Sequence, residues 1–159
     1  MSHVDARGAA RMVDVADKPE TVRTATASAA VKMKRETLRL VERATGARGK
    51  GDVLAVARLA GIMAARRTAE LIPLCHPIRL TNCDVEATVD RTLPGVRLVA
   101  TARAVDRTGV EMEAMLAVGT AALTVYDMVK GAERGVEITA LRLEEKAGGR
   151  TGPWRRTSK

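Results

Sequence analysis

The sequence predicts an α+β fold, a ferredoxin-like sandwich in which a four-stranded antiparallel sheet has its helices packed on one face. Segments that alternate apolar and polar residues predict the strands, two long segments that are apolar nearly all round predict the main helices, and the order reads β-α-α-β-β-α-β. A length of 159 residues suits one domain. We expect a disordered segment over residues 1–11, one ferredoxin-like domain over 12–146 and a basic, flexible tail over 147–159.

The first half of the chain predicts an extended arm, a strand and a short helix. The arm begins at residues 12–15. A strand lies within 25–34, where Val31 and Met33 alternate with lysines. The pattern over 36–44 is that of a short helix with one apolar side.

A longer helix follows, with Asp52 as its N-cap and its end near Glu70. Apolar residues surround it almost completely, which predicts burial on several sides. Its many alanines and one glycine allow close packing against another helix.

The second half predicts a hairpin, a second apolar helix and a final strand. Residues 85–90 and 96–103 alternate cleanly around a turn at 93–95. The helix runs from near Glu113 to Ala132. The apolar phase of the last strand, 136–144, slips by one residue in the middle, which indicates a bulge.

Composition narrows the class of partner. A net charge of +8 and a pI of about 10.2 favour an anionic partner, namely nucleic acid, a phosphorylated small molecule or a membrane surface. Aromatic residues make up only 1% of the chain, so there is no stacking platform for single-stranded nucleic acid. The longest uncharged run, 114–126, is too short to span a bilayer. Two cysteines make no disulfide scaffold, so a reducing cytoplasm is the default location.

Residues 71–78 contain one of the two histidines and one of the two cysteines between two prolines. A residue before proline is held in extended geometry, so Ile72 and His76 are expected to be extended and the strip stiff. Such a strip could hold the His76 imidazole still against a ligand. Taken alone, it also fits a connector whose histidine is merely packed.

Lys50 lies between two glycines just before a helix N-terminus, an arrangement that suits an anion although it lacks the Walker A pattern. A solvated linker lysine is the alternative.

Glu111 and Glu113 flank Met112 and would share one face of an extended segment, where a pair of carboxylates can accept hydrogen bonds from the N–H groups of a purine. The alternative is two glutamates that stabilise the first turn of a helix.

Asp127 and Lys130 are three residues apart on the second long helix, so they share a face. Asp127 follows a long apolar run and is expected to be partly buried. A lysine oriented by a carboxylate in a dry site can give or take a proton. The alternative is an ordinary surface ion pair. Neither a zinc site nor a nucleophile triad is predicted, since Cys75 and His76 point apart and no C-x-x-C motif is present.

Six segments of the chain, in order, resemble one family, the molybdenum cofactor biosynthesis protein C family. They are residues 12–15 (MVDV), 50–53 (KGDV), 71–77 (LIPLCHP), 108–114 (TGVEMEA), 123–128 (LTVYDM) and 146–149 (KAGG). The resemblance covers about residues 12–152. It implies a ferredoxin-like subunit and a homohexamer, a trimer of dimers with active sites at the dimer interfaces. It implies a lyase that converts 3′,8-cyclo-7,8-dihydro-GTP to cyclic pyranopterin monophosphate and releases pyrophosphate.

The resemblance also implies roles for single residues. The catalytic positions are Asp127, Lys130 and Lys50. The substrate-binding positions are Leu74, Cys75, His76, Met112 and Glu113, with Glu111, Arg23 and Lys146 as further active-site residues. Arg150 stands where a lysine is common in the family. No cofactor and no dedicated metal site are expected, although a Mg²⁺ ion arriving with the substrate phosphates is compatible with the pattern.

Two other classes of function remain open on the residues alone. A basic oligomer that grips nucleic acid without catalysis would show a steep salt dependence and would tolerate Glu113→Gln. A purely structural hexamer is the least favoured, because polar motif residues gather at the ends of elements. The enzyme assignment predicts no nucleic acid and no membrane partner.

Overall fold

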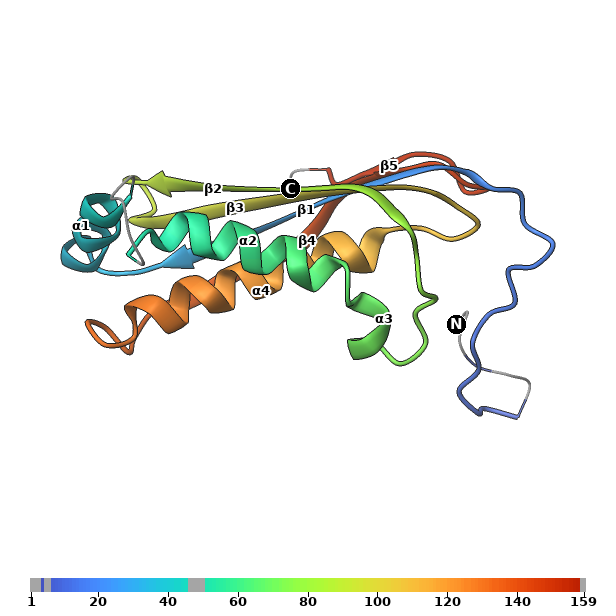
Figure 1. Ribbon diagram of the computed structural model, residues 1–159, viewed down its shortest axis with the longest axis horizontal. Coiled ribbons are helices and arrows are strands. Elements are labelled where there is room, and N and C mark those ends of the chain that lie inside the picture. The colour runs from blue at the N-terminus through green and yellow to red at the C-terminus, as the bar shows by residue number, and fades with distance from the viewer. Residues whose placement is uncertain (1–3, 5–6, 46–50, 158–159) are drawn as a thin grey trace.

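The computed structural model describes residues 4, 7–45 and 51–157, and it confirms the α+β class. One antiparallel sheet, in the order β2-β3-β1-β4-β5, has its two main helices packed on one face (Figure 1). The sheet has five strands, one more than predicted. The strands are β1 (Thr21–Lys32), β2 (Leu80–Asp90), β3 (Gly95–Asp106), β4 (Glu137–Ala147) and β5 (Trp154–Arg155).

The helices are α1 (Arg35–Ala44), α2 (Val53–Ala65), α3 (Thr68–Leu71) and α4 (Glu111–Val129). Asp52 caps α2 as predicted, since its carboxylate accepts a hydrogen bond from the Ala55 amide at 3.0 Å. The single helix predicted to reach Glu70 is wrong, because the backbone leaves helical geometry at Arg67 and a separate short helix follows. The second long helix begins two residues earlier than predicted and ends three residues earlier.

Small residues bring α2, α4 and the sheet into close contact. Ala117 and Ala121 of α4 are completely buried. Gly61 of α2 faces them, and a Cβ added there would lie 2.8 Å from the Ala117 carbonyl oxygen. The core is therefore built from alanine and valine, as the lack of aromatic residues requires. Although α4 is long and apolar enough to cross a membrane by length and composition, its fully buried face identifies it as a core helix.

The predicted bulge in the last strand is confirmed. The pairing of β1 with β4 shifts register between Ser28 and Ala30, and Ala140 on β4 adopts a positive φ of 52°. β1 begins at Thr21 rather than 25. β5 lies in the segment expected to be a flexible tail, where Trp154 pairs with Lys146 on β4.

The helix contact at Gly61 predicts opposite effects for two glycine substitutions. Gly61→Ala should lower the free energy of unfolding in a urea titration by about 1–3 kcal/mol, because the new methyl group meets backbone. Gly119→Ala, in α4, would meet only Leu141 methyl groups at 3.7 Å and beyond. It should instead raise the free energy of unfolding by up to about 1 kcal/mol, from helix propensity. Equal shifts in the two variants would contradict this packing.

Candidate active site

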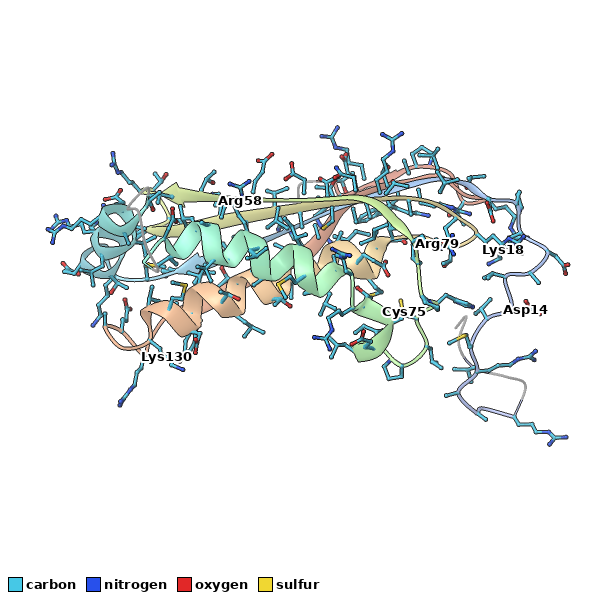
Figure 2. The ribbon with its side chains drawn as sticks, in the orientation of Figure 1. Asp14, Lys18, Arg58, Cys75, Arg79 and Lys130 are labelled. Atoms are coloured by element: carbon cyan, nitrogen blue, oxygen red, sulfur yellow. The ribbon has the colours of Figure 1, made fainter. Side chains whose placement is uncertain are left out.

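The proline-bracketed strip joins α3 to β2. Ile72, before the first proline, is extended with φ −106° and ψ 106°, as predicted. The Cys75 amide closes a turn on the Ile72 carbonyl oxygen at 3.0 Å, and His76 beside it is half-buried. Figure 2 shows Cys75 in the strip beside α3. The strip places the Cys75 thiol near the first turn of α4, since the charges of Glu113 and Glu111 act on it.

Glu113 is the buried carboxyl of this region, only 2% exposed. Its Oε2 atom has no hydrogen-bond partner among residues 4, 7–45 and 51–157. Burial raises the pKa of Glu113 to about 7, its own backbone amide opposes the rise, and the charges of Glu111 and Asp106 add to it. A carboxyl group that titrates near neutrality can exchange a proton with a bound molecule.

The charge of Glu113 contributes to a raised pKa at both cysteines. Burial, followed by repulsion from Glu113 and Glu111, raises the pKa of Cys75. Burial, followed by Asp84 and Glu113, raises the pKa of Cys83 to about 11. The two free side chains are therefore neutral thiols that line the region around the carboxyl group.

The two glutamates do not share an extended face, so that prediction is wrong. α4 starts at Glu111, which places both glutamates in its first turn, about 200° apart around the axis. Glu113 turns into the core, whereas Glu111 lies over Gly109, where a Cβ would come within 1.9 Å of the Glu111 Oε2 atom.

Glu111 reaches a strongly basic cavity of about 390 Å³, which we call the basic hollow. The arm before β1, β1 itself, the β3–α4 loop, the end of β4 and the loop after it all contribute to its walls. The charged residues of the basic hollow are Lys18, Arg23, Arg107, Glu111, Lys146 and Arg150. Five cations thus face one carboxylate, an arrangement suited to a polyanion with a polar attachment.

Arg23 is held in the basic hollow by backbone groups. Its Nε atom donates to the Asp106 carbonyl oxygen at 3.2 Å and its Nη2 atom to the Arg107 carbonyl oxygen at 3.3 Å. The guanidinium lies over Gly149, where a Cβ would come within 1.6 Å of Nη1. The Arg107 side chain in turn donates to the Ala16 carbonyl oxygen at 2.8 Å, which ties the arm and its Lys18 to this corner.

The structure therefore brings together Arg23, Glu111, Lys146 and Arg150 in the walls of one cavity. Lys18 and Arg107 were missed by the sequence analysis, since neither stands out in a chain with 27 lysines and arginines. Beside Cys83 lies a further hollow, of about 460 Å³, to which Arg66 and Arg79 contribute.

Asp127 and Lys130 lie at the other end of α4. The Lys130 Nζ atom is 2.5 Å from the Asp127 Oδ1 atom, and this hydrogen bond raises the pKa of Lys130. The Asp127 side chain is 69% exposed, so the predicted partial burial is wrong for the single chain. Sixteen residues of helix, about 24 Å at 1.5 Å per residue, separate Asp127 from Glu111. Figure 2 shows Lys130 and Cys75 far apart along the long axis of the molecule.

One chain thus places the two groups of predicted site residues that the structure describes at opposite ends of α4. α2 starts at the end of the molecule where α4 finishes (Figure 1). Lys50 itself lies outside the described residues. Within the part of the chain that the structure describes, no three His, Cys, Asp or Glu side chains group in a way that would hold a metal ion.

The buried Glu113 predicts a stability that falls with rising pH. Its pKa is about 7 in the folded chain and near 4.5 in the unfolded chain, so the folded state binds more protons between these values. The free energy of unfolding should fall across this window, by on the order of 3 kcal/mol, and stay low above it. Glu113→Gln should abolish this pH dependence, and its free energy of unfolding at pH 8 should exceed that of wild type. Urea unfolding between pH 5 and 8 measures this, with Glu70→Gln, at an exposed glutamate, as the control. The same slope in wild type and Glu113→Gln would refute the burial argument.

Comparisons with known proteins identify the family of this chain. A family model described as the MoaC family matches residues 12–149. A cyclic pyranopterin monophosphate synthase of Thermomicrobium roseum is 57% identical over 156 residues, which cover 98% of this chain and 93% of the relative. Proteins of the same name from Methylobacterium sp. (strain 4-46) and Brucella ovis are 57% and 54% identical over 154 residues, covering 97% of this chain and 95% and 92% of the relatives. The chain therefore belongs to the MoaC family, as its six motifs predicted.

Proposed function

We propose that this chain is a lyase of molybdenum cofactor biosynthesis, which converts 3′,8-cyclo-7,8-dihydro-GTP to cyclic pyranopterin monophosphate and releases pyrophosphate. The printed name of its relatives is the name of this activity. The basic hollow is the structural observation that carries the proposal, because a triphosphate needs several cations and this cavity offers five. The reaction proceeds by protein side chains, and a Mg²⁺ ion enters, if at all, with the substrate phosphates.

The substrate phosphates occupy the basic hollow. Arg23 presents a planar guanidinium fixed by two backbone carbonyl groups, which favours bidentate contact with a phosphate. Lys146 and Arg150 approach from the end of β4 and the loop after it. Cations held in this way stabilise the negative charge that develops on departing pyrophosphate.

The purine-derived part lies against the strip and the first turn of α4. His76, with Leu74 and Cys75, forms one wall, and Met112 with Glu113 forms the other. The pKa of Glu113 is about 7, so both its protonated and its ionised form are populated around neutral pH. The protonated form donates a hydrogen bond to a ring nitrogen, and the ionised form accepts one from a ring N–H group.

Lys130, oriented by Asp127, carries out the proton transfers of ring opening and reclosure. Lys50 takes part in these transfers or holds the phosphates. Because about 26 Å of helix, at 1.5 Å per residue, separates Lys130 from Glu113, a second copy of the chain has to supply one half of each site. Twofold symmetry achieves this for two sites at once. Exposed apolar residues on α2 and α4 favour such association, namely Leu59, Met63 and Leu123. The complete assembly is a homohexamer of three dimers, in the cytoplasm.

Single turnover with the cyclic GTP precursor tests the activity. Wild type should yield pyrophosphate and the pterin product in equal amounts. Lys130→Ala should lose at least about a hundredfold in rate, the usual scale for removing a general acid or base. Its melting temperature should be unchanged, because the Lys130 side chain is exposed. Full turnover by Lys130→Ala would remove the role assigned to Lys130. If no product forms even with wild type and the protein instead binds nucleic acid with a steep salt slope, the binding-module class is correct.

Mixed assemblies test whether two chains build each site. Lys130→Ala and Glu113→Gln chains are co-expressed in equal amounts and purified together, without selection for mixed assemblies. Each mixed dimer contains one intact site and one site with both defects. With random pairing the unfractionated mixture should recover about a quarter of wild-type activity, since half of the dimers are mixed. Activity no higher than that of the two separate variants would show that one chain carries both residues in its own site.

A further inference from the structure

The loop after β4 builds one wall of the basic hollow. Gly148, Arg150 and Thr151 from this loop line the cavity, next to Lys146 at the end of β4. The Lys146 Nζ atom donates to the Thr151 Oγ1 atom at 2.6 Å. The loop therefore both supplies a cation, Arg150, and fixes the direction of a second one.

The loop has little conformational preference of its own. Three of its residues are glycines with positive φ, namely Gly148 at 94°, Gly149 at 79° and Gly152 at 66°. Within it, the Gly152 amide donates to the Gly149 carbonyl oxygen at 3.1 Å. Glycine loses more conformational freedom on ordering than any other residue, so such a loop needs restraint from outside to keep one conformation.

β5 provides this restraint just beyond the loop. Its two residues pair with β4, Trp154 opposite Lys146 and Arg155 opposite Glu145. A strand this short is marginal by itself. The residue that follows it, Arg156, adds most of the remaining contacts.

Arg156 contacts β4 through backbone and side chain. Its amide donates to the Glu144 carbonyl oxygen at 2.7 Å and its Nε atom to the Leu143 carbonyl oxygen at 2.8 Å. Its guanidinium also lies 3.6 Å from Glu144 and 5.7 Å from the centre of the Trp154 ring. The neighbouring Arg155 side chain makes one ion pair, at 3.6 Å to Glu145, and is 84% exposed.

We propose that β5 and Arg156 form a clasp that holds the loop 148–152 against the basic hollow, and that Arg156 is a positioning residue for substrate binding. Arg156 does not line the basic hollow, so it acts through the loop and not by touching phosphate. The inference rests on the proposed seating of the substrate phosphates in that cavity. Without the clasp, Arg150 and the Thr151 hydroxyl keep their places in only a fraction of the molecules, and the apparent dissociation constant rises by the inverse of that fraction.

Arg156→Ala tests the clasp, with Arg155→Ala as the matched control that removes the same charge from the adjacent position. Steady-state turnover gives KM and kcat, and inorganic tripolyphosphate serves as a competitive probe of the basic hollow. In Arg156→Ala, KM and the inhibition constant of tripolyphosphate should both rise roughly five- to tenfold, the effect of losing the Nε hydrogen bond to Leu143 and the ion pair to Glu144, with kcat within twofold of wild type. Arg155→Ala should stay within twofold of wild type in all three quantities.

Equal changes in the two variants, or a change confined to kcat, would overturn the clasp while leaving the seating of the phosphates intact. Tripolyphosphate that fails to compete with substrate in wild type would overturn that seating and the clasp with it.

Discussion

The close contact between α2 and α4 is the constraint on which the rest of the structure depends. Gly61 meets the Ala117 carbonyl group so closely that no side chain fits between the two helices. Both helices are thereby pressed onto a sheet whose inner face is mostly alanine and valine. Their antiparallel arrangement then fixes which chemical groups appear at which end of the subunit (Figure 1).

This arrangement separates the charges that the proposed reaction needs. The strip, Glu113 and the basic hollow gather where α4 begins, whereas Asp127 and Lys130 sit where it finishes. An exposed lysine and a buried carboxyl group titrate in very different ranges, and their distance in one chain keeps them from neutralising each other. Assembly can then bring opposite charges to one guest molecule without a direct ion pair between them.

Local patterns predicted the strands and helices well, because alternation and apolar runs report directly on burial. The break near Arg66 and Arg67 was not predictable, since no glycine or proline marks it. The start of α4 was misplaced because Val110 offers no capping side chain, and this error put Glu111 and Glu113 on a shared face. The two residues of β5 are too few to show an alternation of apolar and polar side chains, and the strand depends on its pairing with β4.

The candidate site was predictable only in part from the residues. Single motifs indicated anion binding, a rigid histidine and paired carboxylates, but the spacing along the chain does not say that Arg23 meets Lys146. That meeting follows from the pairing of β1 with β4, in which Thr24 lies opposite Ala147. Lys18 and Arg107 join the group because the Arg107 side chain donates to the Ala16 carbonyl oxygen of the arm. No local sequence pattern predicts this contact.

The raised pKa values of Cys75 and Cys83 have a consequence for the durability of the protein. Thiolate, not thiol, reacts with electrophiles and peroxide, and at pH 7 a group with a pKa of about 11 is ionised in only about one molecule in ten thousand. Glu113 suppresses ionisation of both sulfurs by its charge. The two thiols are consequently slow to react with alkylating and oxidising reagents while the chain is folded, and rapid labelling reports unfolding.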